Sequence, residues 1–274
     1  MSPNFAIIII GDEILSGKRA DKHLPKAIEL LGSRGLQLAY ADYVGDDPVR
    51  ITATLARAFE AARELSDVVF SFGGIGATPD DHTRQCAAAA WGVSLALHPE
   101  AKVLITERMQ DTAREQGVPF EPNRPDNIHR LDMGLFPAGA EIICNPYNKI
   151  PGFSCHAGRG AIHFLPGFPV MAWPMMQTVL DTQYAKLHQT MAYIERSIIV
   201  CGSMEATLTP LMVAIEAEYV GVKVFSLPSV DHPEFGRHIE LGVKGMPAAV
   251  DVAYSALLIG LRQFDVTFGP ELVR

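Results

Sequence analysis

The first 72 residues switch repeatedly between short apolar runs and segments with helical spacing. The run FAIIII at 5–10 ends at a glycine, as is typical of a buried strand. Apolar residues recur every three or four positions in 21–34 and again in 49–65, which predicts two helices. The alternating segment 36–44 and the apolar run 67–72 are predicted to be strands.

The middle of the chain continues this order and then departs from it. A glycine-rich loop after residue 72 leads into a helix predicted over 80–91. Residues 98–135 have the pattern of a helical excursion, interrupted by a proline-marked loop at 118–127. We expect this middle segment of the chain to end with short strands near 141–144 and 161–165 and a helix over 170–185.

The last third has a different layout, predicted as strand, helix, strand, strand, helix. Its expected elements are 193–202, 205–219, 222–230, 237–245 and 248–261. This order suits a small α+β domain. We place the boundary within 186–192, which gives one domain at 1–188 and another at 189–274.

Alternating strands and helices predict an α/β fold for the first domain, with a mostly parallel three-layer sheet covered by helices on both faces. Such sheets bind ligands in the crevice beyond the carboxyl ends of their strands. The loops after residues 10 and 72 would lie at that edge. The GDD turn at 45–47 would lie at the same edge if the second strand runs parallel to the first. The sequence pattern leaves the direction of the second strand open.

Composition narrows the class of protein. The 274 residues are 48% hydrophobic and 20% charged, as in an ordinary globular protein. A formal net charge of −8 argues against charge-driven binding to nucleic acid or membrane. The apolar run near the N-terminus is too short for a signal sequence or membrane span. With no metal-type cysteine spacing, we expect free thiols and a cytoplasmic protein; the four cysteines are Cys86, Cys144, Cys155 and Cys201.

The stretch GGIGATPDDHT at 73–83 joins glycines to acidic residues. Glycines between a strand and a helix allow a phosphate to approach main-chain amides, although a tight turn needs glycine for conformational reasons alone. The loop matches neither a P-loop nor a GxGxxG motif. For Asp80 we favour a helix-capping role.

Carboxylates follow all three predicted strands at the inferred ligand edge. They come in three pairs, Asp12 with Glu13, Asp46 with Asp47, and Asp80 with Asp81. Several carboxylates beside a phosphate are unfavourable unless a hard divalent cation lies between them. We therefore expect a divalent metal, with Asp12, Glu13, Asp46 and Asp81 as its candidate ligands.

Three motifs in register carry a family resemblance: GDEILSG at 11–17, VGDDP at 44–48 and GGIGATPDDHT at 73–83. Together with LPGFP at 165–169, they resemble the molybdopterin-binding (MoaB/Mog-like) domain family. The similarity is greatest to the N-terminal part of the competence-damage-inducible CinA proteins and extends over about 5–185. The domain after it resembles the small second domain of CinA.

The resemblance implies roles for individual residues. Asp46 and Asp81 fall on catalytically important acidic positions. The terminal phosphate region of a nucleotide or pterin phosphate would be bound by Gly73, Gly74, Gly76 and Thr78, with Ser16, Pro166 and Gly167 lining the same pocket. CinA-like domains are associated with divalent-metal-dependent (Mg, Mn or Co), potassium-stimulated cleavage of ADP-ribose, and an FAD-synthase relative with FAD hydrolysis.

Three functions stay open from the sequence. We favour hydrolysis of a dinucleotide pyrophosphate, and the alternatives are a molybdopterin adenylyltransferase and a noncatalytic nucleotide- or pterin-binding module. Departures from the family, including Ala77 where proline is common, affect substrate choice more than the phosphate site. Residues 186–274 hold seven Lys/Arg and ten Asp/Glu and lack a GXXG loop, so we expect a spacing or dimerisation domain in a homo-oligomer rather than RNA binding.

Overall fold

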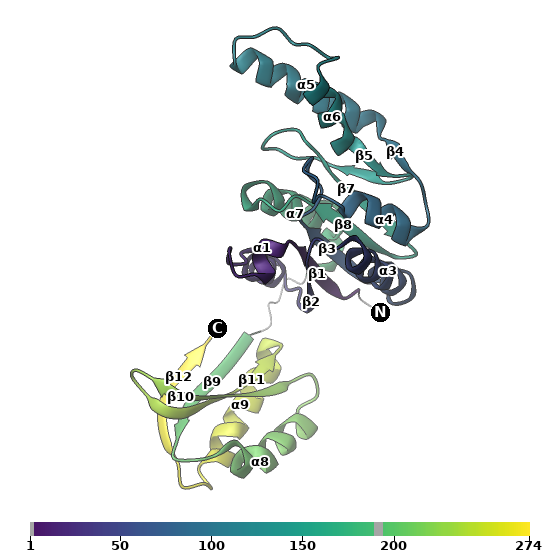
Figure 1. Cartoon of the computed structure of the whole chain (residues 1–274). Coiled ribbons are helices and arrows are strands. Elements are labelled where there is room, and N and C mark those ends of the chain that lie inside the picture. Colours follow the sequence, from purple (N-terminus) through teal and green to yellow (C-terminus); the bar gives the residue numbers. More distant parts are fainter. Residues whose placement is uncertain (1–2, 189–193) are drawn as a thin grey trace. The chain divides into compact units, whose positions relative to one another are not determined.

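The computed structural model describes residues 3–188 and 194–274. The chain forms two compact units, 1–188 and 189–274 (Figure 1). The predicted boundary segment, 186–192, lies partly outside the described residues. Residue 193, the first of the predicted strand 193–202, lies outside them as well. No described helix combines the length and the apolar character needed to cross a bilayer.

A six-stranded sheet forms the centre of the first unit, in the order β2-β1-β3-β8-β7-β6. Four strands are mutually parallel: β1 (Phe5–Ile10), β2 (Leu38–Val44), β3 (Val68–Phe72) and β8 (Gly160–Leu165). The remaining two, β7 (Gly152–Ala157) and β6 (Glu141–Ile143), join by antiparallel pairing. The predicted mostly parallel α/β sheet is therefore confirmed, and β2 is parallel to β1.

Helices cover both faces of the sheet because successive residues of β1 point to opposite sides. Phe5, Ile7 and Ile9 pack with α2 (His23–Gly32) and α7 (Pro169–Gln183). Ala6, Ile8 and Ile10 pack with α3 (Pro48–Leu65) and α4 (Thr83–Trp91). All six residues of β1 are buried, which explains its continuous apolar run.

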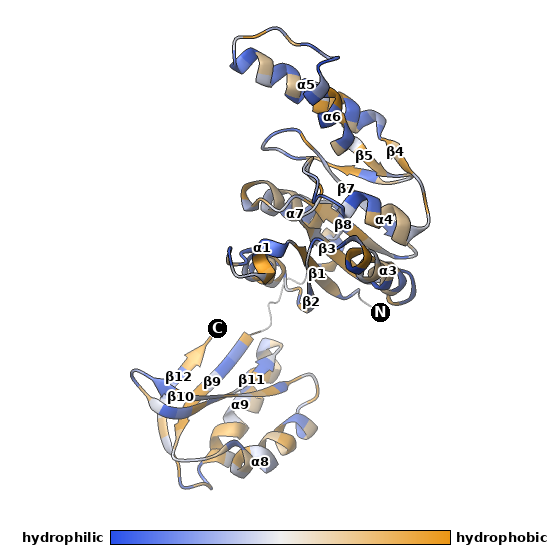
Figure 2. Cartoon of the chain, viewed as in Figure 1, coloured by the Kyte–Doolittle hydropathy of each residue, from blue (hydrophilic) through white to orange (hydrophobic). Residues whose placement is uncertain are grey.

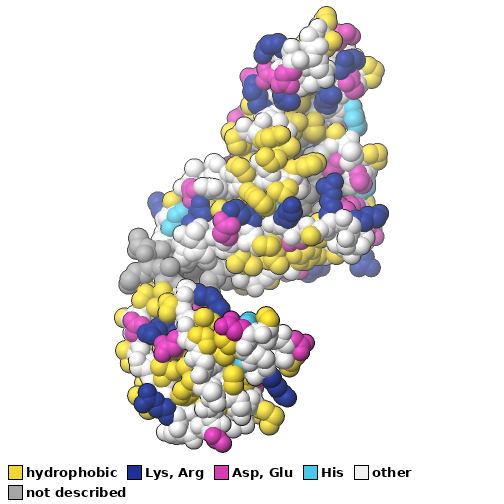
Figure 3. Space-filling model, turned by 90° about the vertical axis from the view of Figure 1, so that its left-hand side faces the viewer, with side chains coloured by type: hydrophobic (Ala, Val, Ile, Leu, Met, Phe, Trp, Pro, Cys, Tyr) yellow, Lys and Arg dark blue, Asp and Glu magenta, His cyan; other side chains and the backbone are white. Residues whose placement is uncertain are grey.

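The excursion between β3 and β6 follows α4 and is built from one long helix, one short helix and a small two-stranded antiparallel sheet. It contains β4 (Leu95–Leu97), α5 (Pro99–Glu115), α6 (Pro125–Leu131), the 3₁₀ helix η1 (Asp132–Gly134) and β5 (Leu135–Pro137). Figure 2 shows hydrophilic and hydrophobic stretches along α5, which buries residues spaced by four, Ala101, Ile105, Met109 and Ala113. Its outer end carries basic and acidic side chains side by side (Figure 3).

The sequence pattern did not predict β4, β5 or β7. The first two have only three residues each, which is too short for an alternation to be recognised. Strand β7 follows Pro151 in a segment rich in turn residues, and its place between β6 and β8 comes from pairing with both neighbours.

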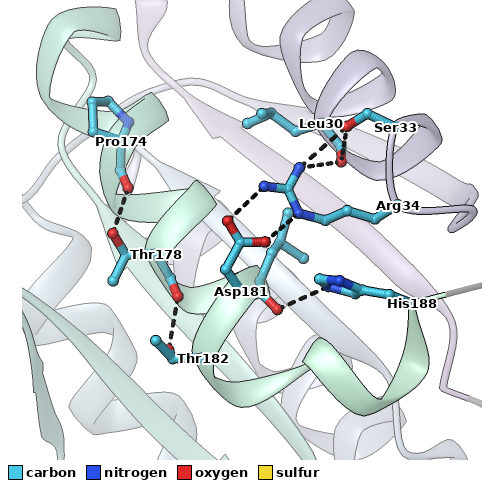
Figure 4. Close-up of polar contacts among 9 residues, drawn as sticks. Leu30, Ser33, Arg34, Pro174, Thr178, Asp181, Thr182 and His188 are labelled. Atoms are coloured by element: carbon cyan, nitrogen blue, oxygen red, sulfur yellow. Dashed lines mark hydrogen bonds and ion pairs between the residues drawn. The ribbon is translucent and has the colours of Figure 1, made fainter.

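Helices α2 and α7 are joined by an ion pair with two hydrogen bonds (Figure 4). The Arg34 guanidinium donates from Nε to Oδ1 of Asp181 over 2.6 Å and from Nη2 to Oδ2 over 2.8 Å. Its Nη1 donates to the carbonyl of Leu30. Arg34 lies two residues after the end of α2. Because its guanidinium also bonds to the last turn of that helix, the pair fixes how the end of α2 meets α7. After α7 comes the 3₁₀ helix η2 (Ala185–Leu187).

A fully buried histidine on β8 ties the sheet to α7. His163 shares hydrogen bonds with Ser154 Oγ and Tyr184 Oη, both at 2.8 Å. Burial lowers the pKa of His163 to about 3, chiefly because the charged ring would be desolvated. The ring is therefore neutral in the folded protein and charges only when the first unit opens.

Acidification is expected to destabilise the first unit through His163. The unfolded chain binds this proton near pH 6.5 and the folded chain only near pH 3, so stability is present above pH 6.5 and is lost as the pH falls. The loss reaches about 2 to 3 kcal/mol at pH 4.5. Urea unfolding followed by tryptophan fluorescence reports this unit, since both tryptophans, Trp91 and Trp173, lie in it. A His163→Gln variant should be less stable at pH 7 yet show a flatter acid dependence; an unchanged dependence would contradict the assignment.

The second unit is an antiparallel four-stranded sheet in the order β10-β11-β9-β12, packed on two helices. Its elements are β9 (Ile194–Cys201), α8 (Glu205–Glu218), β10 (Lys223–His232), β11 (Gly236–Gly245), α9 (Pro247–Leu261) and β12 (Thr267–Val273). The edge strand β12 was not predicted, because a glycine and a proline interrupt it and its pairing with β9 shifts register.

Candidate functional site

Four loops meet at the carboxyl edge of the parallel strands of the first unit. The amide of Gly11 donates to Val44 O, and that of Gly73 to Leu165 O, so that the loops after β1 and β2, and after β3 and β8, are held in pairs. Between them lies a cleft of about 210 Å³. A parallel β2 brings the GDD turn to this edge, as the predicted ligand site requires.

Most of the residues singled out from the sequence line this cleft. The glycine loop contributes Gly73, Gly74, Gly76 and Thr78, and the turn after β8 contributes Pro166 and Gly167. Acidic side chains come from three different loops: Glu13, Asp46, Asp80 and Asp81. Ser16, by contrast, is exposed at the end of the short helix α1 (Asp12–Leu15) and is not among the lining residues.

Asp12 and Asp46 bind each other's main chain. The amide of Asp12 donates to Asp46 Oδ2 over 2.8 Å, and the amide of Asp46 donates to Asp12 Oδ1 over 3.1 Å. Asp12 therefore fastens the loop after β1 to the turn after β2 and does not itself line the cleft. The neighbouring Gly45 leaves room for this carboxylate, since a Cβ there would overlap Asp12 Oδ1.

The half-buried carboxylate of Asp46 lies among like charges. Its pKa is raised above the usual value, mainly by burial and further by the carboxylates of Asp12, Glu13 and Asp80. The hydrogen bond from the Asp12 amide opposes this rise without cancelling it. A cation in the cleft would relieve the repulsion.

Asp81 is held by a residue of its own loop. Its Oδ2 accepts hydrogen bonds from the amide of Thr78 over 2.7 Å and from the Thr78 hydroxyl over 2.5 Å. Helix α4 begins at Thr83, not near residue 80 as predicted, and its N-cap residue His82 makes no side-chain capping bond. Asp80 is consequently no helix cap. Its side chain is exposed, and a hydrogen bond from Thr78 lowers its pKa.

The glycine loop exposes main-chain amides to the cleft. Two of its residues, Gly73 (φ 101°) and Gly74 (φ 67°), have conformations that favour glycine. Within the described residues, the amides of 74–77 donate to no protein acceptor. Unpaired donors next to glycines form the kind of concave surface that binds anions.

No three His, Cys, Asp or Glu side chains group as a complete metal site among residues 3–188 and 194–274. Mg²⁺ in phosphate sites is commonly held by one or two carboxylates together with substrate phosphate oxygens, and not by a cage of protein ligands. Carboxylates of Glu13, Asp46 and Asp81 around one cleft, with the pKa of Asp46 raised by burial and further by like charge, fit that donor chemistry.

A family model described as a probable molybdopterin binding domain matches residues 6–186. The chain belongs to this molybdopterin binding domain family. The match covers the sheet, its helices and all four loops of the cleft.

Relatives of the molybdopterin binding domain family agree with this assignment. A CinA-like protein of Anaeromyxobacter dehalogenans is 35% identical over 164 residues, which are 60% of this chain and 37% of the relative. The chain thus spans well under half the length of that relative. A second relative, from Thermoplasma volcanium, has a name that states no function. It is 27% identical over 222 residues, which are 81% of this chain and 79% of the relative. The crystal structure of a CinA protein of unknown function from Thermoplasma acidophilum is 27% identical, with a TM-score of 0.54 over 64% of this chain and 96% of that one.

Sequence reasoning missed two residues that hold the glycine loop of this molybdopterin binding domain. The buried Arg84, on α4, donates from Nη1 to the carbonyls of Ile75 and Gly76. His129, on α6, bonds through Nε2 to the carbonyl of Ala77 over 2.9 Å. An arginine at the start of a helix that follows a glycine loop was a usable signal for Arg84. Nothing in the local sequence indicated His129, which lies 52 positions away.

Proposed function

We propose that the first unit is a divalent-metal-dependent hydrolase of a dinucleotide pyrophosphate of the ADP-ribose or FAD type. One observation carries the proposal: a single cleft combines the amides of residues 74–76, which have no acceptor within the described residues, with carboxylates from three loops. Amides suit phosphate oxygens, and carboxylates beside a phosphate call for a cation between them. Family membership supports a pterin- or nucleotide-like ligand.

In this proposal the residues of the cleft have different roles in catalysis. The amides of the glycine loop bind and orient the phosphoryl group. Asp46 and Asp81 would hold the ion or position the attacking water, and Glu13 adds negative charge at the same rim. A divalent ion, when bound, would polarise the phosphoryl oxygens and lower the pKa of water. Thr78 fixes the orientation of the Asp81 carboxylate through its two hydrogen bonds.

A second candidate is a molybdopterin adenylyltransferase, and the match to a molybdopterin binding domain supports its pterin substrate. That reaction needs the same phosphate cradle and metal, with an acceptor phosphate in place of water. The activities of the longer CinA-like relatives do not transfer to this chain as a whole, because it spans 37% to 42% of their length.

The proposal is tested by incubating the purified protein with ADP-ribose, FAD, or molybdopterin plus ATP. Each mixture contains Mg²⁺, Mn²⁺ or Co²⁺, with and without potassium, and a parallel sample contains a chelator. We expect AMP from ADP-ribose or FAD, and none with the chelator. Adenylylated pterin would instead identify the transferase. Nucleotide binding without product would leave a binding module, and the absence of both binding and turnover would reject the phosphate site.

A further inference from the structure

The carbonyl groups of residues 73–77 in the glycine loop bond to residues of helices α4 and α6. Thr83, the first residue of α4, donates from its hydroxyl to Gly73 O and from its amide to Gly74 O, each over 3.0 Å. Arg84 donates to the next two carbonyls, and His129 bonds to that of Ala77. Five consecutive carbonyls, those of 73–77, thus have partners on the helix side.

This anchoring decides where the amides point. In a trans peptide the C=O of one residue and the N–H of the next lie on opposite sides of the chain, and the described residues contain no cis peptide bond. Carbonyls drawn toward α4 and α6 therefore turn the amides of 74–78 the other way, toward the cleft. Four of these amides have no acceptor in the part of the protein that the structure describes, and the fifth, of Thr78, donates to Asp81.

The carbonyls of Ile75, Gly76 and Ala77 are held by Arg84 and His129 alone. These carbonyls have no other donor within the described residues. Arg84 is 4% exposed, and burial lowers the pKa of its guanidinium, while the charges of Asp81 and Asp132 act against this. Arg84 forms no salt bridge with a carboxylate among the described residues. Burying this cation against two main-chain carbonyls is costly unless the loop geometry needs it.

We propose that Arg84 and His129 are positioning residues that hold the loop as an anion cradle for the terminal phosphate of the ligand. They touch no substrate. Arg84 acts through the amides of Gly76 and Ala77, and His129 acts through the amide of Thr78, which donates to the Asp81 carboxylate. His129 comes from the excursion between β3 and β6, which gives that excursion a part in shaping the phosphate site. The inference rests on the proposed function only in that the cleft takes a phosphate.

The test measures binding of inorganic pyrophosphate, with and without Mg²⁺, by titration calorimetry on the full chain. The variants are Arg84→Met, Arg84→Lys and His129→Ala. The matched control is His156→Ala. Both histidines are exposed and lie beside a carboxylate: His129 Nδ1 is 3.2 Å from Asp132 Oδ2, and His156 Nε2 is 3.1 Å from Glu141 Oε2. His156 does not line the cleft. Circular dichroism and the thermal midpoint report folding of each variant.

We expect Arg84→Met to weaken pyrophosphate binding at least tenfold and His129→Ala severalfold, with the control unchanged. Arg84→Lys should recover part of the loss, since an ammonium can reach one carbonyl but not both in the arginine geometry. In turnover assays the effect should fall on KM more than on kcat.

The outcomes separate the two proposals. A wild-type protein that binds neither pyrophosphate nor nucleotide removes the proposed function and this inference together. A wild-type protein that binds pyrophosphate, with His129→Ala and Arg84→Lys both folded and within twofold of its affinity, overturns the inference and leaves the proposed function standing. If Arg84→Met fails to fold, these two milder variants still decide the matter.

Discussion

Asp81→Asn is expected to lower kcat for pyrophosphate hydrolysis by about a thousandfold while the protein stays folded. An asparagine keeps the shape of the side chain, and its carbonyl oxygen still accepts the hydrogen bonds from Thr78. What it loses is the negative charge, and with it the attraction for a cation beside the phosphate. The measurement is AMP release from ADP-ribose or FAD under saturating divalent metal.

The control for this variant is Asp47→Asn, one position from Asp46 in the turn after β2. Asp47 caps α3 by accepting from the amides of Val49 and Arg50, and it does not line the cleft. Asparagine is an equally good N-cap residue, so both stability and kcat should be unchanged. If Asp81→Asn retained more than a tenth of the wild-type kcat, Asp81 would have no part in the chemistry.

Gly73→Ala is expected to destabilise the first unit by about 3 to 5 kcal/mol. Gly73 has φ 101°, which costs any residue with a Cβ. An added Cβ would also overlap the carbonyl oxygen of Ile10, a main-chain atom of β1 that cannot rotate away. Urea unfolding followed by tryptophan fluorescence measures the loss, since both tryptophans lie in this unit.

Gly92→Ala separates the two causes. Gly92, at the end of α4, has φ 77° but open space around the position of a Cβ. This variant should lose only the conformational part, about 1 kcal/mol. If Gly73→Ala and Gly92→Ala lowered the free energy of unfolding equally, the close approach of the glycine loop to β1 would make no contribution to stability. Gly73→Ala should also lose phosphate binding, because the loop can no longer sit against the end of β1.

Much of the first unit was predictable because its signals are local. The run at 5–10 alternates between two buried faces, so that its apolar character alone indicated a central strand. Helix α3 was predicted over 49–65 and spans Pro48–Leu65, since its buried face repeats with the helical period over five turns. The glycine loop and the three pairs of carboxylates were also visible, because glycines and acidic residues after buried strands stand out from their neighbours.

Other features of the fold could not be predicted from the sequence, because they depend on pairing with residues that are distant in the chain. The direction of β2 follows from pairing with β1, and β7 and β12 exist through pairing that their own glycines and prolines obscure. The start of α4 at Thr83 follows from its bonds to Gly73 and Gly74, which no propensity encodes.

By itself the sequence determined the α/β class, the order of most elements and which loops would carry glycines and carboxylates, because periodicity and turn chemistry are properties of neighbouring residues. Only the tertiary structure decided that Asp12 fastens the Asp46 turn, that Ser16 lies apart from the cleft, and that Arg84 and His129 hold the loop carbonyls. The physical reason is that a hydrogen bond between residues 34 or 52 positions apart forms only after the sheet has brought their loops together.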